Sequence, residues 1–359
     1  MTRPNQTVID ALVHPFVGNS LSSHLGEPFR RWPLRTPTSR AAHKPPFDEY
    51  AIEALPTTTA RHLKERLLES NVGHAVLAPL TFGLSADARF DVAIASALNS
   101  WLAETLLNDQ DAKPTFVGSI RVAPRDVRSA VKEIEKWASD PRFVQVAVTT
   151  EALAPYGQEN YFPIWEAASS FGLPVLVCAD NSRSVGPGIS PIGYPTHYLE
   201  VTTLGPLAGT AHLVSLICSG VFERLESLVF VFGDGAFDVV APLLWRSNKD
   251  WMALRSEVPW VTRPPLEYLS RHARFILGSC DGPLNVKDFD RFVELTHFAP
   301  LLMYGSRYPR WDQFGVGAAE SWVPPRHHER FFRGVAADLY SRGNLRQASE
   351  ANSGREPKA

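Results

Sequence analysis

Residues 115–148, TFVGSIRVAPRDVRSAVKEIEKWASDPRFVQVAV, contain one complete strand–helix–strand pattern. The apolar runs at 115–120 and 143–148 are typical of buried parallel strands, which carry apolar residues without strict alternation. Between them, residues 124–138 place apolar side chains three and four positions apart, as an amphipathic helix does. The segment therefore predicts one βα unit followed by the strand of the next.

The same pattern recurs along the chain on both sides of this segment. Apolar runs predict eight strands, at 7–14, 75–79, 115–120, 143–148, 174–178, 228–232, 274–277 and 300–304. Helical spacing predicts helices at 60–71, 90–107, 124–138, 161–171, 206–224, 239–255, 286–295 and 327–340. Eight βα units in 359 residues predict an α/β fold of the (β/α)8 TIM-barrel type, with a doubly wound open sheet as the alternative.

Composition and charge narrow the class of protein. The chain is 44% hydrophobic and 21% charged, and 36 basic residues against 38 acidic ones give a net charge of −2. This balance argues against nucleic-acid or membrane-surface binding, and no apolar stretch is long enough to span a bilayer. Three scattered cysteines and no signal segment predict a cytoplasmic protein with reduced thiols. We expect one domain over 1–343 and a disordered tail over 344–359.

A TIM barrel carries its functional side chains at the carboxyl ends of the strands. In this sequence those positions hold His14, Cys178, Asp234 and Arg307. The four side chains offer a titratable ring, a thiol, a carboxylate and a permanent cation, so we expect a chemically active pocket there.

Several segments in order along the chain resemble the amidohydrolase-related family, in the branch that includes aminocarboxymuconate-semialdehyde decarboxylase. They are VIDALVHP at 8–15, DPRFVQ at 140–145, GLPV at 172–175, GVFER at 220–224, LLWR at 243–246, LRSEVPW at 254–260, RPP at 263–265 and GSRYPRWD at 305–312. The resemblance implies a TIM barrel with a divalent metal, usually zinc, at its mouth. It also implies hydrolysis or carbon–carbon lysis, and a homodimer as the assembly to test.

The metal positions implied by the resemblance fall on Leu12, His14, Cys178, Asp234 and Arg307. Four of these five depart from the family pattern. Leucine has no donor atom, and the guanidinium of Arg307 is always protonated and repels a divalent ion. We therefore expect the usual metal centre to be absent and no cofactor to be needed. The alternative is zinc held by His14, Cys178 and Asp234.

Without the metal, the same side chains suggest acid–base chemistry. Arg307 would hold an anion, either paired with Asp234 or bound to a substrate carboxylate. His14 would move a proton, on the expectation of a pKa near neutrality, and Cys178 is a candidate nucleophile. The alternative for each is structural: a core histidine, a small buried cysteine, and an ion pair that fills a vacated site. The predicted substrate-binding residues are Arg121, Asp180, Tyr304, Tyr308 and Trp311.

The sequence thus predicts an amidohydrolase-like enzyme that has lost its metal centre. Its expected reaction is a decarboxylation, elimination, tautomerisation or cyclisation of a small organic molecule such as a carboxylic acid. The alternatives are a metal-dependent hydrolase or decarboxylase with an altered ligand set, and a non-catalytic binding protein of the same fold. We expect a small-molecule substrate, no nucleic acid and no membrane as partners.

Overall fold

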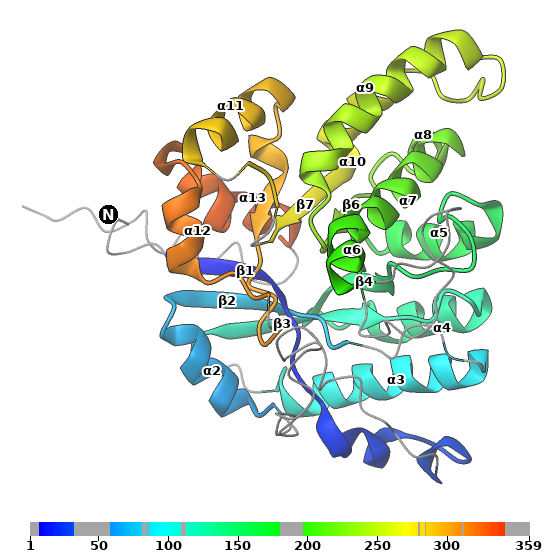
Figure 1. Ribbon diagram of the computed structural model, residues 1–359. Coiled ribbons are helices and arrows are strands. Elements are labelled where there is room, and N and C mark those ends of the chain that lie inside the picture. Colours follow the sequence, from blue (N-terminus) through cyan, green and yellow to red (C-terminus); the bar gives the residue numbers. More distant parts are fainter. Residues whose placement is uncertain are drawn as a thin grey trace, which may run out of the picture.

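The strands of the chain are short runs of Val, Ile, Phe and Leu, and almost every residue in them is buried. The computed structural model describes residues 7–31, 58–80, 85, 87–108, 113–179, 197–278, 281–283, 285–310 and 312–341. Its eight strands are parallel neighbours in sequence order and form a nearly closed barrel (Figure 1). The strands are β1 Val8–Val13, β2 Val72–Leu77, β3 Thr115–Arg121, β4 Phe143–Thr149, β5 Val175–Cys178, β6 Phe230–Phe232, β7 Ala273–Leu277 and β8 Leu302–Tyr304.

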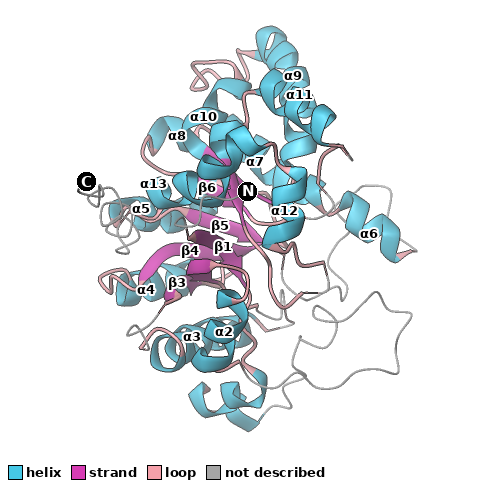
Figure 2. Cartoon of the chain, turned by 90° about the vertical axis from the view of Figure 1, so that its left-hand side faces the viewer, coloured by secondary structure: helices cyan, strands magenta, loops and turns pink. Residues whose placement is uncertain are grey.

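Helices lie between the strands and surround the barrel (Figure 2). The α-helices are α2 Ala60–Leu68, α3 Ala88–Thr105, α4 Val127–Trp137, α5 Phe162–Ser170, α6 Tyr198–Leu204, α7 Pro206–Cys218, α8 Val221–Arg224, α9 Phe237–Leu254, α10 Leu269–His272, α11 Val286–Thr296, α12 Val316–Trp322 and α13 Val335–Leu339. Short helical turns are η1 Gly18–His24, η2 Phe29–Arg31, η3 Glu159–Tyr161, η4 Pro265–Tyr268, η5 Ala299–Leu301, η6 Pro325–His327 and η7 Arg330–Gly334, of which η7 is a π-helix.

The first and last strands meet through main-chain and side-chain hydrogen bonds just beyond β8. The peptide N–H of Arg307 donates to the carbonyl of Leu12 at 2.8 Å. The N–H of Ser306 donates to Oδ1 of Asp10 at 2.9 Å. Asp10 is fully buried, and burial raises the pKa of its carboxyl group to about 6. The barrel is thus closed where β8 gives way to the segment that carries Arg307.

Strand alternation divides the core into two clusters. Side chains that point into the barrel form one cluster, which includes Leu12, Val76, Leu176, Ile276 and Met303. Side chains that point outward pack under the helices in the second and larger cluster, which contains most of the aromatic rings. This geometry fixes which strand residues can reach a ligand inside the barrel and which serve only to hold the helices.

The amino-terminal end of the barrel is closed by residues of α13 and the position after it. Val335, Ala336 and Tyr340 pack against the inner cluster. The Tyr340 hydroxyl donates to Oε1 of Gln145 at 2.9 Å, and the Gln145 amide donates to Ser119 at 2.8 Å. Function is therefore expected at the open, carboxyl end.

The predicted barrel is confirmed, and most element boundaries differ from the expected ones by a few residues. Two of these differences have a clear local cause. Strand β2 begins at Val72 because His74, which interrupts the apolar run, is satisfied by a 2.6 Å hydrogen bond to Thr115. The helix predicted over 206–224 is split into α7 and α8 at Gly220, which takes a φ of 71°. The domain boundary at 343 and the tail lie outside the described residues. No helix in the described ranges is long and apolar enough to cross a membrane.

Replacing Tyr340 with Phe tests the closure of the amino-terminal end. The change removes the hydroxyl and leaves the Gln145 carbonyl oxygen buried with one partner fewer. An unpartnered buried acceptor costs about 1–3 kcal/mol, so Tyr340→Phe should lower the free energy of unfolding by that amount in urea denaturation. Ser341→Ala, at the exposed neighbouring position, is the control. A loss no larger than that of the control would show that this hydrogen bond does not stabilise the closure.

Candidate active site at the carboxyl end of the barrel

The predicted strand-end residues do gather at the carboxyl end of the barrel. His14 follows β1, Arg121 ends β3, Cys178 ends β5, Asp234 follows β6 and Arg307 follows β8. Four of the five side chains are almost fully buried, and Asp234 is 20% exposed. Their environment therefore depends on the neighbours that each of them has inside the protein.

The ring of His14 has a defined tautomer. Its Nδ1 lies 2.8 Å from the carbonyl oxygen of Ala78, which can only accept, so Nδ1 carries the hydrogen. The other nitrogen, Nε2, is buried and has no hydrogen-bond partner among the described residues. The structure thus leaves a neutral ring with an unoccupied lone pair, which is the form of a general base.

The environment of His14 corrects the expected pKa near neutrality. Burial lowers the pKa of His14 to about 3, and the positive charges of Arg310, Arg121 and Arg307 add to this effect. The ring is therefore neutral at physiological pH in the free protein, and it would be a base before it is an acid. Sequence reasoning missed this because the closed barrel determines the two largest causes, the burial of the ring and the position of Arg310.

Arg307 is held in an unusual conformation that buries its guanidinium. Its φ is 57°, in the left-handed region, and its side chain fills the space beside Gly278, where any Cβ would overlap it. Nη1 lies 3.4 Å from Asp312 and Nη2 lies 3.8 Å from Asp281. Nε and Nη2 are buried and have no hydrogen-bond partner among the described residues. The two carboxylates thus balance the positive charge of Arg307, while its Nε and Nη2 remain available as N–H donors.

The predicted ion pair between Arg307 and Asp234 does not form. Asp234 Oδ2 instead accepts hydrogen bonds from the Thr150 hydroxyl, at 3.2 Å, and from the Ala179 amide. Its Oδ1 lies 3.9 Å from Nη1 of Arg310. Asp234 is therefore held by a main-chain amide and a hydroxyl group from the neighbouring strand ends. Its nearest guanidinium is that of Arg310, not that of Arg307.

Three charged residues of the mouth were missed by sequence reasoning: Asp281, Arg310 and Asp312. Arg310 binds Asp312 through two hydrogen bonds of 2.8 and 3.1 Å. Although burial raises the pKa of Asp312, Arg310 and Arg307 outweigh it and bring the value to about 2. For Asp281 burial prevails, and its pKa is raised despite Arg307. The signal for Arg310 and Asp312 was present in the segment 305–312, but both lie beyond the strand end.

Cys178 and Arg121 contact each other. Nη2 of Arg121 lies 3.4 Å from the sulfur of Cys178, and Nε donates to the carbonyl of Pro79 at 2.7 Å. The Arg121 main chain is bound on both sides by the amide of Asn99. Cys178 has no exposed surface, which favours the structural interpretation of this thiol over a nucleophile.

Of the two predicted aromatic wall residues that the structure describes, Tyr304 points away from the mouth. The Tyr304 hydroxyl donates to the carbonyl of Phe314 at 2.7 Å, and its ring packs on Phe331 and Phe332 in the outer cluster. The Tyr308 ring lies against the guanidinium of Arg66 on α2. The outward position of Tyr304 corrects the expectation for that residue, whereas substrate contact by Tyr308 stays a prediction. Asp180 and Trp311, also predicted to bind substrate, lie outside the described residues.

The described donor set does not fit a divalent metal. No group of three His, Cys, Asp or Glu side chains that could hold a metal ion occurs in the part of the chain described. Leu12 belongs to the apolar inner cluster, and the carboxylate expected after β8 is replaced by a guanidinium with no lone pair. The guanidinium of Arg121 lies on Cys178. Two of the five positions at which the family resemblance places ligands thus involve an arginine. Arg307 occupies one of them, and Arg121 contacts Cys178 at another.

The fold and its polar mouth define a TIM-barrel protein of the amidohydrolase type. The amidohydrolase family model matches residues 9–342, and the chain belongs to this family. No curated protein matches the chain in sequence.

Solved structures of similar fold include several decarboxylases. An amidohydrolase from Mycobacterium avium subsp. paratuberculosis superposes with a TM-score of 0.72 at 18% identity, covering 94% of this chain and 98% of that one. The 5-carboxyvanillate decarboxylase of Sphingomonas paucimobilis gives 0.68 at 18% identity, covering 93% and 99%. A dihydroxybenzoic acid decarboxylase from Polaromonas, with bound manganese and 2-nitroresorcinol, gives 0.67 at 17% identity, covering 94% and 97%. At these identities the likeness establishes the fold.

The buried, neutral state of His14 makes stability depend on pH. Its folded-state pKa of about 3 is below the ordinary value of 6.5, so this position stabilises the fold fully above pH 6.5 and loses that contribution as pH falls toward 3. The loss approaches 1.4 kcal/mol per pH unit, or about 2 kcal/mol at pH 5. In urea unfolding, His14→Gln should lack this part of the decline. The contribution of Asp10 to stability changes with pH in the opposite direction. It is the same in the wild type and in His14→Gln, so it cancels in the comparison. Parallel stability profiles from pH 7 to 5 would contradict the buried neutral ring.

Proposed function

We propose that this protein is a decarboxylase-like carbon–carbon lyase that acts on a small hydroxy-substituted carboxylic acid, of the hydroxybenzoate type, without a metal ion. The observation that carries the proposal is the pairing of two unsatisfied features in one mouth. One is the lone pair on Nε2 of His14, and the other is the set of free N–H donors on Arg307. A carboxylate can accept from the guanidinium while an acidic hydroxyl or a reacting carbon faces the ring nitrogen.

Similarity in fold supports this choice of chemistry. The structures with this architecture include enzymes described as 2,6-dihydroxybenzoate and 5-carboxyvanillate decarboxylases. Decarboxylation replaces the carboxylate with a proton, so it needs a group that delivers a proton and a group that stabilises negative charge. It does not need an activated water, which hydrolysis would have to obtain from a metal. The side chains present in this mouth therefore suit decarboxylation better than hydrolysis.

The proposed role of His14 follows from its charge environment. The arginines that lower the pKa of His14 would be partly neutralised by a bound carboxylate, so binding of an anionic substrate raises that pKa. Nε2 can then take a proton from solvent or from the substrate hydroxyl and deliver it to the ring carbon that bears the carboxylate. The carbon–carbon bond breaks, its electron pair returns to the ring, and carbon dioxide leaves.

The arginines have the complementary role. Arg307 and Arg310 provide a positive field that remains in place while charge moves from the carboxylate into the ring. Asp281 and Asp312 hold the two guanidinium groups, so they position the site and do not touch the substrate. The expected contributions of Asp180 and Trp311, the homodimer and the cytoplasmic location remain predictions.

Metal content and turnover, measured on the same sample, test the proposal. Protein purified without chelator should carry well under one equivalent of zinc, manganese or iron by plasma mass spectrometry. Loss of the ultraviolet absorbance of 2,6-dihydroxybenzoate or 5-carboxyvanillate should proceed equally before and after treatment with EDTA. Activity that disappears with EDTA and returns with manganese would instead favour the metal-dependent alternative. Absence of turnover with any hydroxybenzoate would favour the binding-protein alternative.

Substitutions in the mouth separate binding from proton transfer. His14→Gln keeps a hydrogen-bonding side chain but cannot carry the proton, so kcat should fall by about 10²–10⁴-fold with a smaller change in KM. Arg310→Met removes one charged contact and should raise KM by roughly tenfold to a hundredfold.

The matched control for the histidine is His62→Gln, on the exposed face of α2, which should change neither constant. If His14→Gln retained wild-type kcat on an active substrate, the proposed proton transfer would be wrong even though the protein was an enzyme.

A further inference from the structure

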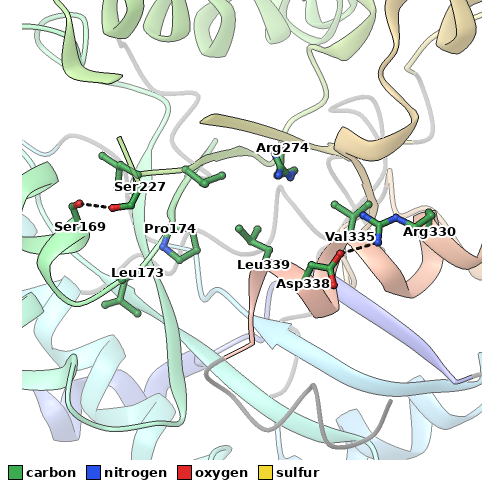
Figure 3. A pocket seen from close by; sticks show the side chains of 12 residues that line it. Ser169, Leu173, Pro174, Ser227, Arg274, Arg330, Val335, Asp338 and Leu339 are labelled. Atoms are coloured by element: carbon green, nitrogen blue, oxygen red, sulfur yellow. Dashed lines mark hydrogen bonds and ion pairs between the residues drawn. The ribbon is translucent and has the colours of Figure 1, made fainter. Parts of the chain in front are cut away.

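A cavity lies at the amino-terminal end of the barrel, opposite the mouth around His14. It has a volume of about 310 Å³, at the lower end of the range of small-molecule sites. Its walls come from the segments that lead into β5 and β6, from the start of β7, and from η7 and α13. Figure 3 shows the lining side chains. None of the residues assigned to the mouth around His14 lines this cavity.

Arg274 is the residue that distinguishes this cavity from a packing defect. It is the second residue of β7, where Ala273 and Phe275 belong to the outer cluster and Ile276 to the inner one. Alternation along the strand therefore points Arg274 to the inside of the barrel. An apolar residue could pack equally well at this position of the inner face. The packing of the strand therefore does not require the charge of Arg274.

The guanidinium of Arg274 is only partly satisfied. Nη1 donates to the main-chain carbonyls of Ala273 and Ser270, at 2.7 and 3.1 Å. Among the described residues, Nε and Nη2 make no hydrogen bond, and no carboxylate lies within ion-pair distance of the group. The side chain is half-buried, so these two donors remain accessible to solvent or to a ligand. Burial and the neighbouring Arg330 lower the pKa of Arg274, and Asp338 acts in the opposite direction.

The other charges around the cavity balance one another. Arg330 binds Asp338 at 2.7 Å, and this pair forms one wall (Figure 3). On the far wall the hydroxyls of Ser169 and Ser227 lie 3.2 Å apart and are uncharged. The cavity consequently has one excess positive charge, that of Arg274.

The remaining walls are apolar. They consist of Leu173, Pro174, Leu228, Val229, Val335 and Leu339. A ligand that matched both parts of the cavity would have an anionic head with two oxygens in one plane and a compact hydrocarbon body. The planar fork of a guanidinium favours a carboxylate head in this arrangement.

We propose that the amino-terminal cavity is a second binding site, which takes a small carboxylate with an apolar body, and that Arg274 binds its carboxylate group. The site is separate from the mouth and does not depend on the reaction proposed there. Because α13 forms part of its wall and also closes the barrel, an occupied cavity would stabilise the closure of that end.

Calorimetric titration of the full chain with hexanoate tests this site. We expect one saturable site on the wild-type protein, with 1-hexanol and inorganic phosphate binding at least tenfold more weakly, because each lacks one half of the match. Arg274→Met keeps the length of the side chain and removes its charge, so it should weaken hexanoate binding at least tenfold. Ser227→Phe fills space at the rim of the cavity without touching the cation and should weaken hexanoate binding as well. This second variant tests the site even if Arg274→Met does not fold.

Two further variants locate the site. Arg271→Met removes an exposed arginine close by, on α10, and should leave the hexanoate affinity unchanged. Arg310→Met alters the mouth and should also leave it unchanged. The proposal is overturned if Arg274→Met binds hexanoate as tightly as the wild type, if affinity is lost in Arg310→Met, or if phosphate binds as well as hexanoate. Melting temperatures without ligand establish that each variant is folded.

Discussion

Arg307 buries a permanently charged guanidinium in a space that exists because position 278 is glycine. A cation removed from water needs opposite charge close by, since an uncompensated one costs several kcal/mol. Asp281 and Asp312 supply it from the segments after β7 and β8. Each of these carboxylates is fixed in turn, Asp281 by the Gly278 amide and Asp312 by Arg310. One buried charge thus determines the arrangement of the whole face.

The same charges determine what His14 can do. Three arginines and burial keep its ring neutral, and the hydrogen bond to Ala78 directs the lone pair to Nε2. A bound anion acts in the opposite direction, because it reduces the positive potential at the ring. Protonation of His14 is thereby coupled to occupancy of the site. In a metal-dependent barrel a cation of fixed charge would supply the field, whereas in the reaction proposed for this protein it comes from side chains whose own partners hold them in place.

Much of the fold was predictable from the sequence, and rather less of the site. The eight apolar runs marked every strand, but not the exact element boundaries. His74 and Gly220 each displaced a boundary, because a satisfied buried histidine and a left-handed glycine are invisible to hydrophobic periodicity. His14 and Arg307 were placed at the mouth by the rule that strand ends carry function. Their partners were not, because an ion pair such as that of Arg307 with Asp281 joins loops whose relative position only the closed barrel defines.

Two of the inward-facing arginines, Arg307 and Arg274, differ in how an incoming anion would meet them. At the mouth, an anion competes with Asp281 and Asp312 for a guanidinium that already has counter-charge, so charge alone contributes little to binding there. A ligand gains only if it also meets the free donors of Arg307 and the lone pair of His14, which selects molecules with a carboxylate and a second polar group. At the other end, Arg274 has main-chain carbonyls as its hydrogen-bond partners, and a carboxylate displaces no described acidic group from it. Taken together, the two proposals give the barrel a selective anion site at one end and a permissive one at the other.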